Sequence, residues 1–147
     1  MIYKTAPEDF DTRGGRDVVG CYVMHHDRFL LLKRQHHKPS GGHWGLPAGK
    51  CEPHETTTAA MLRELQEETG IIASLAEISH VATVFVRNEG RDFIYHMFVL
   101  NMETEPAVRL SPEEHLEYRF VSREESETLD LVHDQHECTD IFYSRKS

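Results

Sequence analysis

Residues 49–71 read GKCEPHETTTAAMLRELQEETGI and have the most informative spacing in the chain. From position 56 to position 69 this stretch contains no glycine or proline and is rich in Ala, Leu, Met and Glu. Such a composition predicts a helix, and Gly70 provides its end. Gly49 and Pro53 mark the preceding residues as a loop. The sequence therefore predicts a short loop that leads directly into a helix.

The predicted helix carries three glutamates on one face. At about 100° per residue, the following side chains fall within about 100° of one another: Glu64, Glu67 and Glu68. We expect Leu62 and Leu65, with Ala59 beside them, to occupy the opposite face and pack on a sheet. A solvated polar face is the plainest interpretation, but it leaves the preceding loop unexplained. Clustered carboxylates are the hard oxygen ligands that Mg²⁺ and Mn²⁺ prefer.

The composition indicates one globular domain over residues 1–147. Hydrophobic residues make up 39% of the chain and charged residues 28%. No uninterrupted apolar run approaches the roughly 18 residues that a membrane span needs. The 25 acidic residues outnumber the 16 basic ones, for a net charge of −9, which argues against binding to long nucleic acids.

The acidic residues are unevenly distributed. Residues 1–48 contain seven basic and five acidic side chains, whereas residues 49–71 contain two and five. Three cysteines without a C-x-x-C pattern fit free thiols in a reducing compartment: Cys21, Cys51 and Cys138. The first residues lack the apolar core of a signal peptide, so we expect a cytoplasmic protein.

Strands and helices alternate along the rest of the chain. The predicted strands are residues 17–26, 29–34, 75–87, 91–101 and 118–121, and the strands at 75–87 and 91–101 are joined at Asn88-Glu89-Gly90. The predicted loops are residues 35–44 and 111–117. A short helix capped by Ser122 is predicted at 123–129, and a last helix at 134–143. This order predicts an α/β sandwich with a mixed β-sheet.

The segment from Gly49 to Ile71 resembles the Nudix box, Gly-x5-Glu-x7-Arg-Glu-U-x-Glu-Glu-x-Gly-U, in which U is apolar. It matches at every specified position, and a chance match has a probability on the order of 10⁻⁹ per start position. The resemblance implies the α/β/α sandwich of this family over most of the chain. It also implies hydrolysis of a diphosphate linkage with Mg²⁺ or Mn²⁺.

The resemblance further implies roles for the residues of the box. Glu67 and Glu68 are expected as the principal metal ligands, with the Gly49 carbonyl as an additional ligand. Glu64 is expected as a further ligand or as the base that activates water. General principles agree, because phosphoryl transfer requires neutralised charge and a positioned water.

Two arginines are candidates for positioning charge. By the same resemblance, Arg63 would orient the glutamates by pairing with Glu67 or Glu55, and Glu55 would brace the loop against the helix. Arg34 ends a predicted strand, at a position where family members often contact phosphate. A solvated arginine at the end of a strand is the alternative there.

Two further candidates lie outside the box. Residues 111–121 resemble the E-H-x-E-Y-R-W-V segment of nucleotide-hydrolysing members, with Phe120 in place of Trp. Such members often supply a fourth carboxylate or a general base from this loop, and Glu114 is the favoured candidate. Its neighbours are the alternatives: Glu113, His115 and Glu117. Trp44 either stacks on a base of the substrate or anchors its loop in the core.

The combined prediction is a metal-dependent pyrophosphohydrolase acting on a nucleoside di- or triphosphate, including non-standard or oxidised ones. A nucleotide-sugar hydrolase is one alternative, because the segment from Trp44 to Gly49 resembles members of both kinds. A nucleotide-binding regulatory domain without turnover is the other. Such domains usually lose glutamates of the box, and this chain keeps them all. Dimerisation is common in the family, so a homodimer is compatible with the resemblance.

Overall fold

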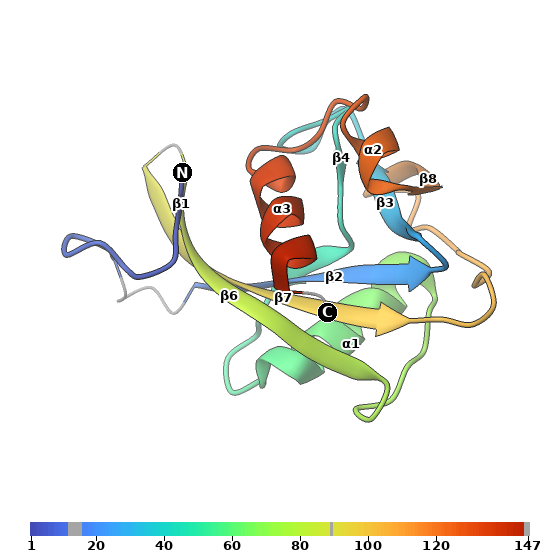
Figure 1. Ribbon diagram of the computed structural model, residues 1–147, viewed down its shortest axis with the longest axis horizontal. Helices are drawn as coiled ribbons and strands as arrows, with labels where there is room; N and C mark the ends of the chain where they lie inside the picture. The colour runs from blue at the N-terminus through green and yellow to red at the C-terminus, as the bar shows by residue number, and fades with distance from the viewer. Residues whose placement is uncertain (12–15, 89, 146–147) are drawn as a thin grey trace.

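The computed structural model describes residues 1–11, 16–88 and 90–145, and shows an α/β/α sandwich around a mixed sheet (Figure 1). The elements are β1 (Ile2–Tyr3), β2 (Asp17–His25), β3 (Arg28–Arg34), β4 (Trp44–Gly45), β5 (Ala48–Lys50), α1 (Thr57–Thr69), β6 (Ile78–Asn88), β7 (Arg91–Asn101), β8 (His115–Val121), α2 (Arg123–Ser126) and α3 (Gln135–Arg145). Helix α1 lies on one face of the sheet and α3 on the other. The predicted fold class is confirmed.

The sheet opens between its central strands β2 and β3. These strands pair only next to their turn, at Met24↔Phe29 and His25↔Arg28. Beyond that point, β2 pairs with β7 in parallel on one side and with β5 antiparallel on the other. Strand β3 pairs instead with β4 and β8. The split leaves room for a site between β5 and the end of β3.

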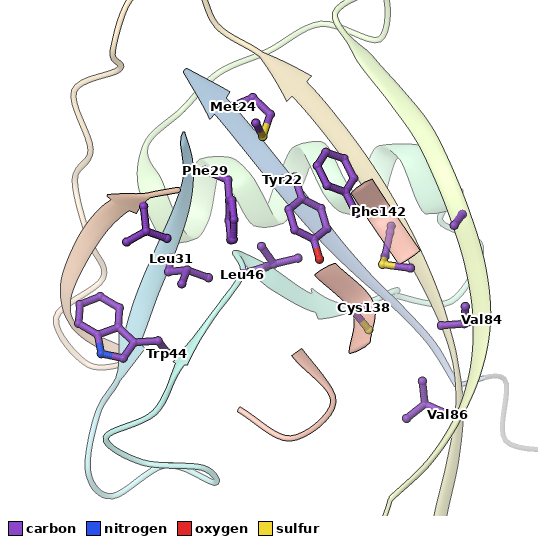
Figure 2. Close-up of a cluster of buried hydrophobic side chains, with 13 residues drawn as sticks. Tyr22, Met24, Phe29, Leu31, Trp44, Leu46, Val84, Val86, Cys138 and Phe142 are labelled. Carbon is purple, nitrogen blue, oxygen red and sulfur yellow. The ribbon is translucent and has the colours of Figure 1, made fainter. Parts of the chain in front are cut away.

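Two hydrophobic clusters hold the layers together. The cluster under α3 includes Tyr22 and Phe142, whose stacked rings have centroids 3.9 Å apart (Figure 2). The other cluster lies under α1 and includes Met61 and Leu65. Because both sheet faces are covered by helices, β2 is buried along most of its length, which explains its nearly continuous apolar sequence.

Helix α1 begins and ends as its sequence predicts. The Thr56 side chain accepts a hydrogen bond from the Ala59 N–H at 3.1 Å, and Gly70 adopts a left-handed φ of 75° at the other end. The predicted apolar face was wrong at Ala59, which is exposed, whereas Leu65 is buried and half-buried Leu62 packs against the cluster under α1. The buried positions are Ala60, Met61, Leu65, Glu68 and Thr69. Glu68 lies only about 20° from Met61 around the helix, so it points toward the sheet.

Other element boundaries differ from those that the sequence predicts. Strand β6 begins at Ile78, because residues 74–77 form a turn in which the Ser74 N–H donates to Glu77. Strand β8 already begins at His115, within the predicted loop, because it pairs with β3. Trp44 belongs to β4. The hairpin between β6 and β7 is present, with Asn88 opposite Arg91, while Glu89 lies outside the described residues.

Candidate metal and phosphate site

A cavity of about 490 Å³ lies at the opening of the sheet. Its lining comes from the end of β3 and the loop after it, from β5 and the following loop, from α1, and from the residue before β8: Arg34, Lys38, 48–53, Arg63, Glu64, Glu68 and Glu114. Carboxylates and cationic side chains therefore line a single cavity.

Glu68 is the most deeply placed carboxylate of this site. Its exposed fraction is 5%, and its Oε1 accepts a hydrogen bond from the Ala48 N–H at 2.9 Å. Burial raises the pKa of Glu68 to about 9, and the charges of Glu64 and Glu114 add to the effect. A buried carboxyl group beside two others is stabilised as an anion when a cation lies among them.

The Glu64 carboxyl group lies directly against the backbone of β5 at Gly49. A Cβ atom placed on Gly49 would meet the carboxyl group of Glu64. Burial raises the pKa of Glu64, while the hydrogen bond from Arg63 opposes this shift. A side chain at position 49 would therefore displace this carboxyl group from its hydrogen bond with Arg63.

Arg63 connects the helix to the preceding loop. Its Nε and Nη2 donate to the two carboxylate oxygens of Glu55 at 2.8 and 2.9 Å, and Nη2 also donates to the Lys50 carbonyl at 3.0 Å. Its Nη1 donates to Glu64 at 2.9 Å and to Glu67 at 3.3 Å. Arg63 therefore contacts both predicted partners, with the shorter bonds to Glu55.

The two outer glutamates differ in environment. Arg63 is the main cause that lowers the pKa of Glu55 to about 2, and the Glu52 N–H contributes. Glu55 therefore stays ionised and braces the loop, as the resemblance implied. The Glu67 side chain is 59% exposed, so it reaches solvent at the outer edge of the site.

Glu114 and His115 approach Glu68 from the other side of the cavity. One ligand atom from each of these three residues lies within 4.8 Å of the other two. The His115 side chain is 4% exposed, and its Nδ1 is buried without a hydrogen-bond partner in the part of the chain that is described. Burial, with the charges of Arg34 and Lys38, lowers the pKa of His115 to about 4, so the ring is neutral near pH 7.

Two cationic side chains face these carboxylates. Arg34 uses its Nε to donate to the Pro39 carbonyl at 2.7 Å, which holds the side chain against its own loop. Lys38 lines the same cavity, and sequence reasoning missed it because a lone lysine in a loop has no distinguishing pattern. The pair provides positive charge for a phosphate group opposite the glutamates.

Trp44 lies in the core and is only 5% exposed (Figure 2). The Arg119 guanidinium lies 5.1 Å from its ring centroid. Trp44 is not one of the described residues that line the cavity. Its surroundings match the alternative in which it anchors its segment.

The residues present fit a divalent cation. Glu64, Glu68 and Glu114 line one cavity, and each of Glu64 and Glu114 raises the pKa of Glu68. Hard oxygen donors of this kind bind Mg²⁺ and Mn²⁺, which usually retain waters and take further oxygens from substrate phosphates. The cavity can therefore hold a cation at the glutamates and a phosphate group toward Arg34 and Lys38.

Comparison with known proteins gives a consistent result. The NUDIX domain model matches residues 14–140. The CTP pyrophosphohydrolase of Escherichia coli is 32% identical over 112 residues, which is 69% of this chain and 80% of that protein. The 8-oxo-dGTP diphosphatase of Proteus vulgaris is 46% identical over 53 residues, which is 36% of this chain and 47% of that protein. The crystal structure of the MutT protein from Methanosarcina mazei has a TM-score of 0.72 and 28% identity, and covers 88% of this chain and 91% of its own.

Proposed function

This chain belongs to the Nudix hydrolase family, and on that basis we propose that it is a Mg²⁺- or Mn²⁺-dependent pyrophosphohydrolase that cleaves the diphosphate linkage of a nucleoside di- or triphosphate. The observation that carries the proposal is the single cavity in which buried Glu68 lies among other carboxylates and faces Arg34 and Lys38. Such an arrangement suits a ligand that brings both a cation and a phosphate chain.

The side chains divide the work of the reaction. Glu67 and Glu68, with the Gly49 carbonyl and either Glu64 or Glu114, would hold the metal, and Arg34 and Lys38 would hold the phosphate chain. When bound, a divalent cation neutralises phosphate charge and lowers the pKa of a coordinated water. Arg63 keeps Glu64 in place through the hydrogen bond at 2.9 Å. Glu64 and Glu114 are both half-buried in this cavity, and whichever of them does not hold the metal can accept the proton of the attacking water.

Free nucleotides are the proposed substrate class. Similarity to a CTP pyrophosphohydrolase over most of both chains supports a nucleoside triphosphate, and similarity to an 8-oxo-dGTP diphosphatase supports testing oxidised nucleotides. A nucleotide-sugar hydrolase remains the alternative within this reaction class. The three cysteines are free, which fits the reducing cytoplasm in which we place the reaction.

The decisive experiment is a panel of nucleotides incubated with Mg²⁺ or Mn²⁺. The panel contains the ordinary and 8-oxo nucleoside di- and triphosphates together with nucleotide sugars. We expect a nucleoside monophosphate as product, with pyrophosphate released from a triphosphate and phosphate from a diphosphate. Glu67→Gln and Glu68→Gln are expected to abolish most turnover, and Glu137→Gln, at an exposed position of helix α3, is the matched control. Binding without turnover across the panel would favour the regulatory alternative instead.

A further inference from the structure

His115 is a buried histidine that lies beside two carboxylates, and its Nδ1 has no hydrogen-bond partner among the described residues. A buried imidazole usually has hydrogen-bond partners for its nitrogens, because an unpaired polar atom in the interior is destabilising. The Nδ1 of His115 has no hydrogen-bond partner among the described residues, although only 4% of the residue is exposed. This nitrogen is therefore available to a ligand that is not a protein group.

The position of His115 is set by an irregularity in the pairing of β8 with β3. Lys33 lies opposite Glu117, but Arg34 lies opposite His115, so Leu116 is an extra residue in β8. Such bulges redirect neighbouring side chains and are frequent next to functional sites. The bulge falls where β8 reaches the cavity, and His115 follows Glu114 directly.

The distances suit a metal ion. A ring nitrogen of His115 and carboxylate oxygens of Glu68 and Glu114 lie within 4.8 Å of one another. Two donors on opposite sides of an ion, each about 2.2 Å from it, are about 4.4 Å apart. The separations of the three groups are therefore of the size found among ligands of a single ion.

We propose that His115 provides a nitrogen ligand to the divalent cation of this site, together with Glu68 and Glu114, and that it gives the site a preference for first-row transition-metal ions over Mg²⁺. Imidazole binds Co²⁺, Ni²⁺ and Zn²⁺ well, whereas Mg²⁺ strongly prefers oxygen donors. The inference rests on the proposed function for the presence of the metal, and deepens it by naming the class of ion.

The primary test is pulsed electron paramagnetic resonance of the protein loaded with Mn²⁺ alone. Two samples are compared, one with natural histidine and one grown with ¹⁵N-histidine. We expect a nitrogen hyperfine coupling that changes with the isotope in the wild-type chain. Absence of an isotope-sensitive coupling would overturn the proposal without any need for a variant to fold.

A second measurement assigns the coupling to His115. We compare His115→Gln with His37→Gln, which alters an exposed histidine in the nearby loop. The first variant should lose the coupling and bind Co²⁺ at least about tenfold more weakly in calorimetry, with Mg²⁺ affinity changed less than about threefold. The His37→Gln control should keep both the nitrogen coupling and the Co²⁺ affinity. A coupling that persists in His115→Gln, or equal weakening of both ions, contradicts the proposal.

The two proposals fail in distinguishable ways. A protein that hydrolyses nucleotides but shows no histidine coupling retains the proposed function and refutes the role of His115. A protein with the coupling but without turnover on any nucleotide retains this metal site and refutes the proposed hydrolase reaction.

Discussion

Arg63 donates two hydrogen bonds to Glu55, at 2.8 and 2.9 Å, so the guanidinium and the carboxylate meet side by side. The same guanidinium holds Glu64 at 2.9 Å. A planar group with several fixed donors can pair side by side with one carboxylate and still reach a second, a geometry that the single nitrogen of an ammonium group does not provide. The loop before α1 and the face of the helix are thus positioned by one side chain.

Replacing Arg63 should therefore lower both activity and stability. Because Arg63→Lys keeps the charge but loses the paired geometry, we expect kcat/KM to fall about 100-fold. The free energy of unfolding should fall by about 1–3 kcal/mol. Steady-state kinetics and urea denaturation measure the two effects. Arg145→Lys, at an exposed position in the last turn of α3, is the control. An equally large loss of kcat/KM in this variant would contradict a specific role for Arg63.

Gly49 should tolerate a side chain only when Glu64 is shortened. Since an added Cβ would meet the Glu64 carboxyl group, Gly49→Ala should lower the free energy of unfolding by about 1–3 kcal/mol. The same change in a Glu64→Ala background should cost much less. A double-mutant cycle from denaturation curves measures this coupling. If the effects of Gly49→Ala and Glu64→Ala on the free energy of unfolding are strictly additive, the added Cβ does not meet the Glu64 carboxyl group.

Glu68 should make the metal-free protein less stable as the pH rises. Its pKa is about 9 in the folded chain against 4.5 for the free side chain, so between these values the folded state binds more protons than the unfolded state. The contribution of this group to stability is therefore lost progressively from about pH 4.5 to pH 9, by up to about 1.4 kcal/mol per pH unit.

The measurement is thermal unfolding in a chelator at several pH values. Glu68→Gln, which stays neutral, should lack this part of the slope, so its stability relative to wild type should be greater at pH 8 than at pH 5. Added Mn²⁺ should stabilise wild type much more than the variant. Parallel pH profiles for the two proteins would mean that Glu68 is not buried as an acid.

Arg34 should act on substrate binding. It lines the cavity and influences the pKa of both Glu68 and His115. Loss of a charged hydrogen bond to phosphate costs about 1.5–3 kcal/mol, so Arg34→Gln should raise KM about 10- to 100-fold. Lys38→Gln should have a smaller effect, because an ammonium group makes one point contact. Lys4→Gln, on an exposed terminal residue, should leave KM unchanged, and a similar KM for all three variants would exclude the role.

Local sequence patterns were sufficient for much of this fold. Helix α1, with its cap at Thr56 and its end at Gly70, follows from composition and capping rules that act within a few residues. The positions of the three glutamates and of Gly49 follow from the spacing of the box. The β6–β7 hairpin follows from a turn signal between two β-prone segments.

Only the tertiary structure decided which of these groups are buried and which of them meet. Glu67 and Glu68 are adjacent in sequence, but Glu67 reaches solvent while Glu68 points toward the sheet, because neighbours on a helix differ by about 100°. The expected apolar face was wrong at Ala59, which is exposed, since the orientation of the helix depends on the sheet beneath it.

The meeting of His115 with Glu68 depends on pairing between β3 and β8, which are about 80 residues apart in the chain, and on one extra residue at Leu116. Such pairings form when distant segments bury their apolar faces together, and no local pattern encodes their register. The sequence by itself determined that this protein has a carboxylate-rich helix behind a glycine-bounded loop. The packing of the sheet decided which side chains complete the site around it.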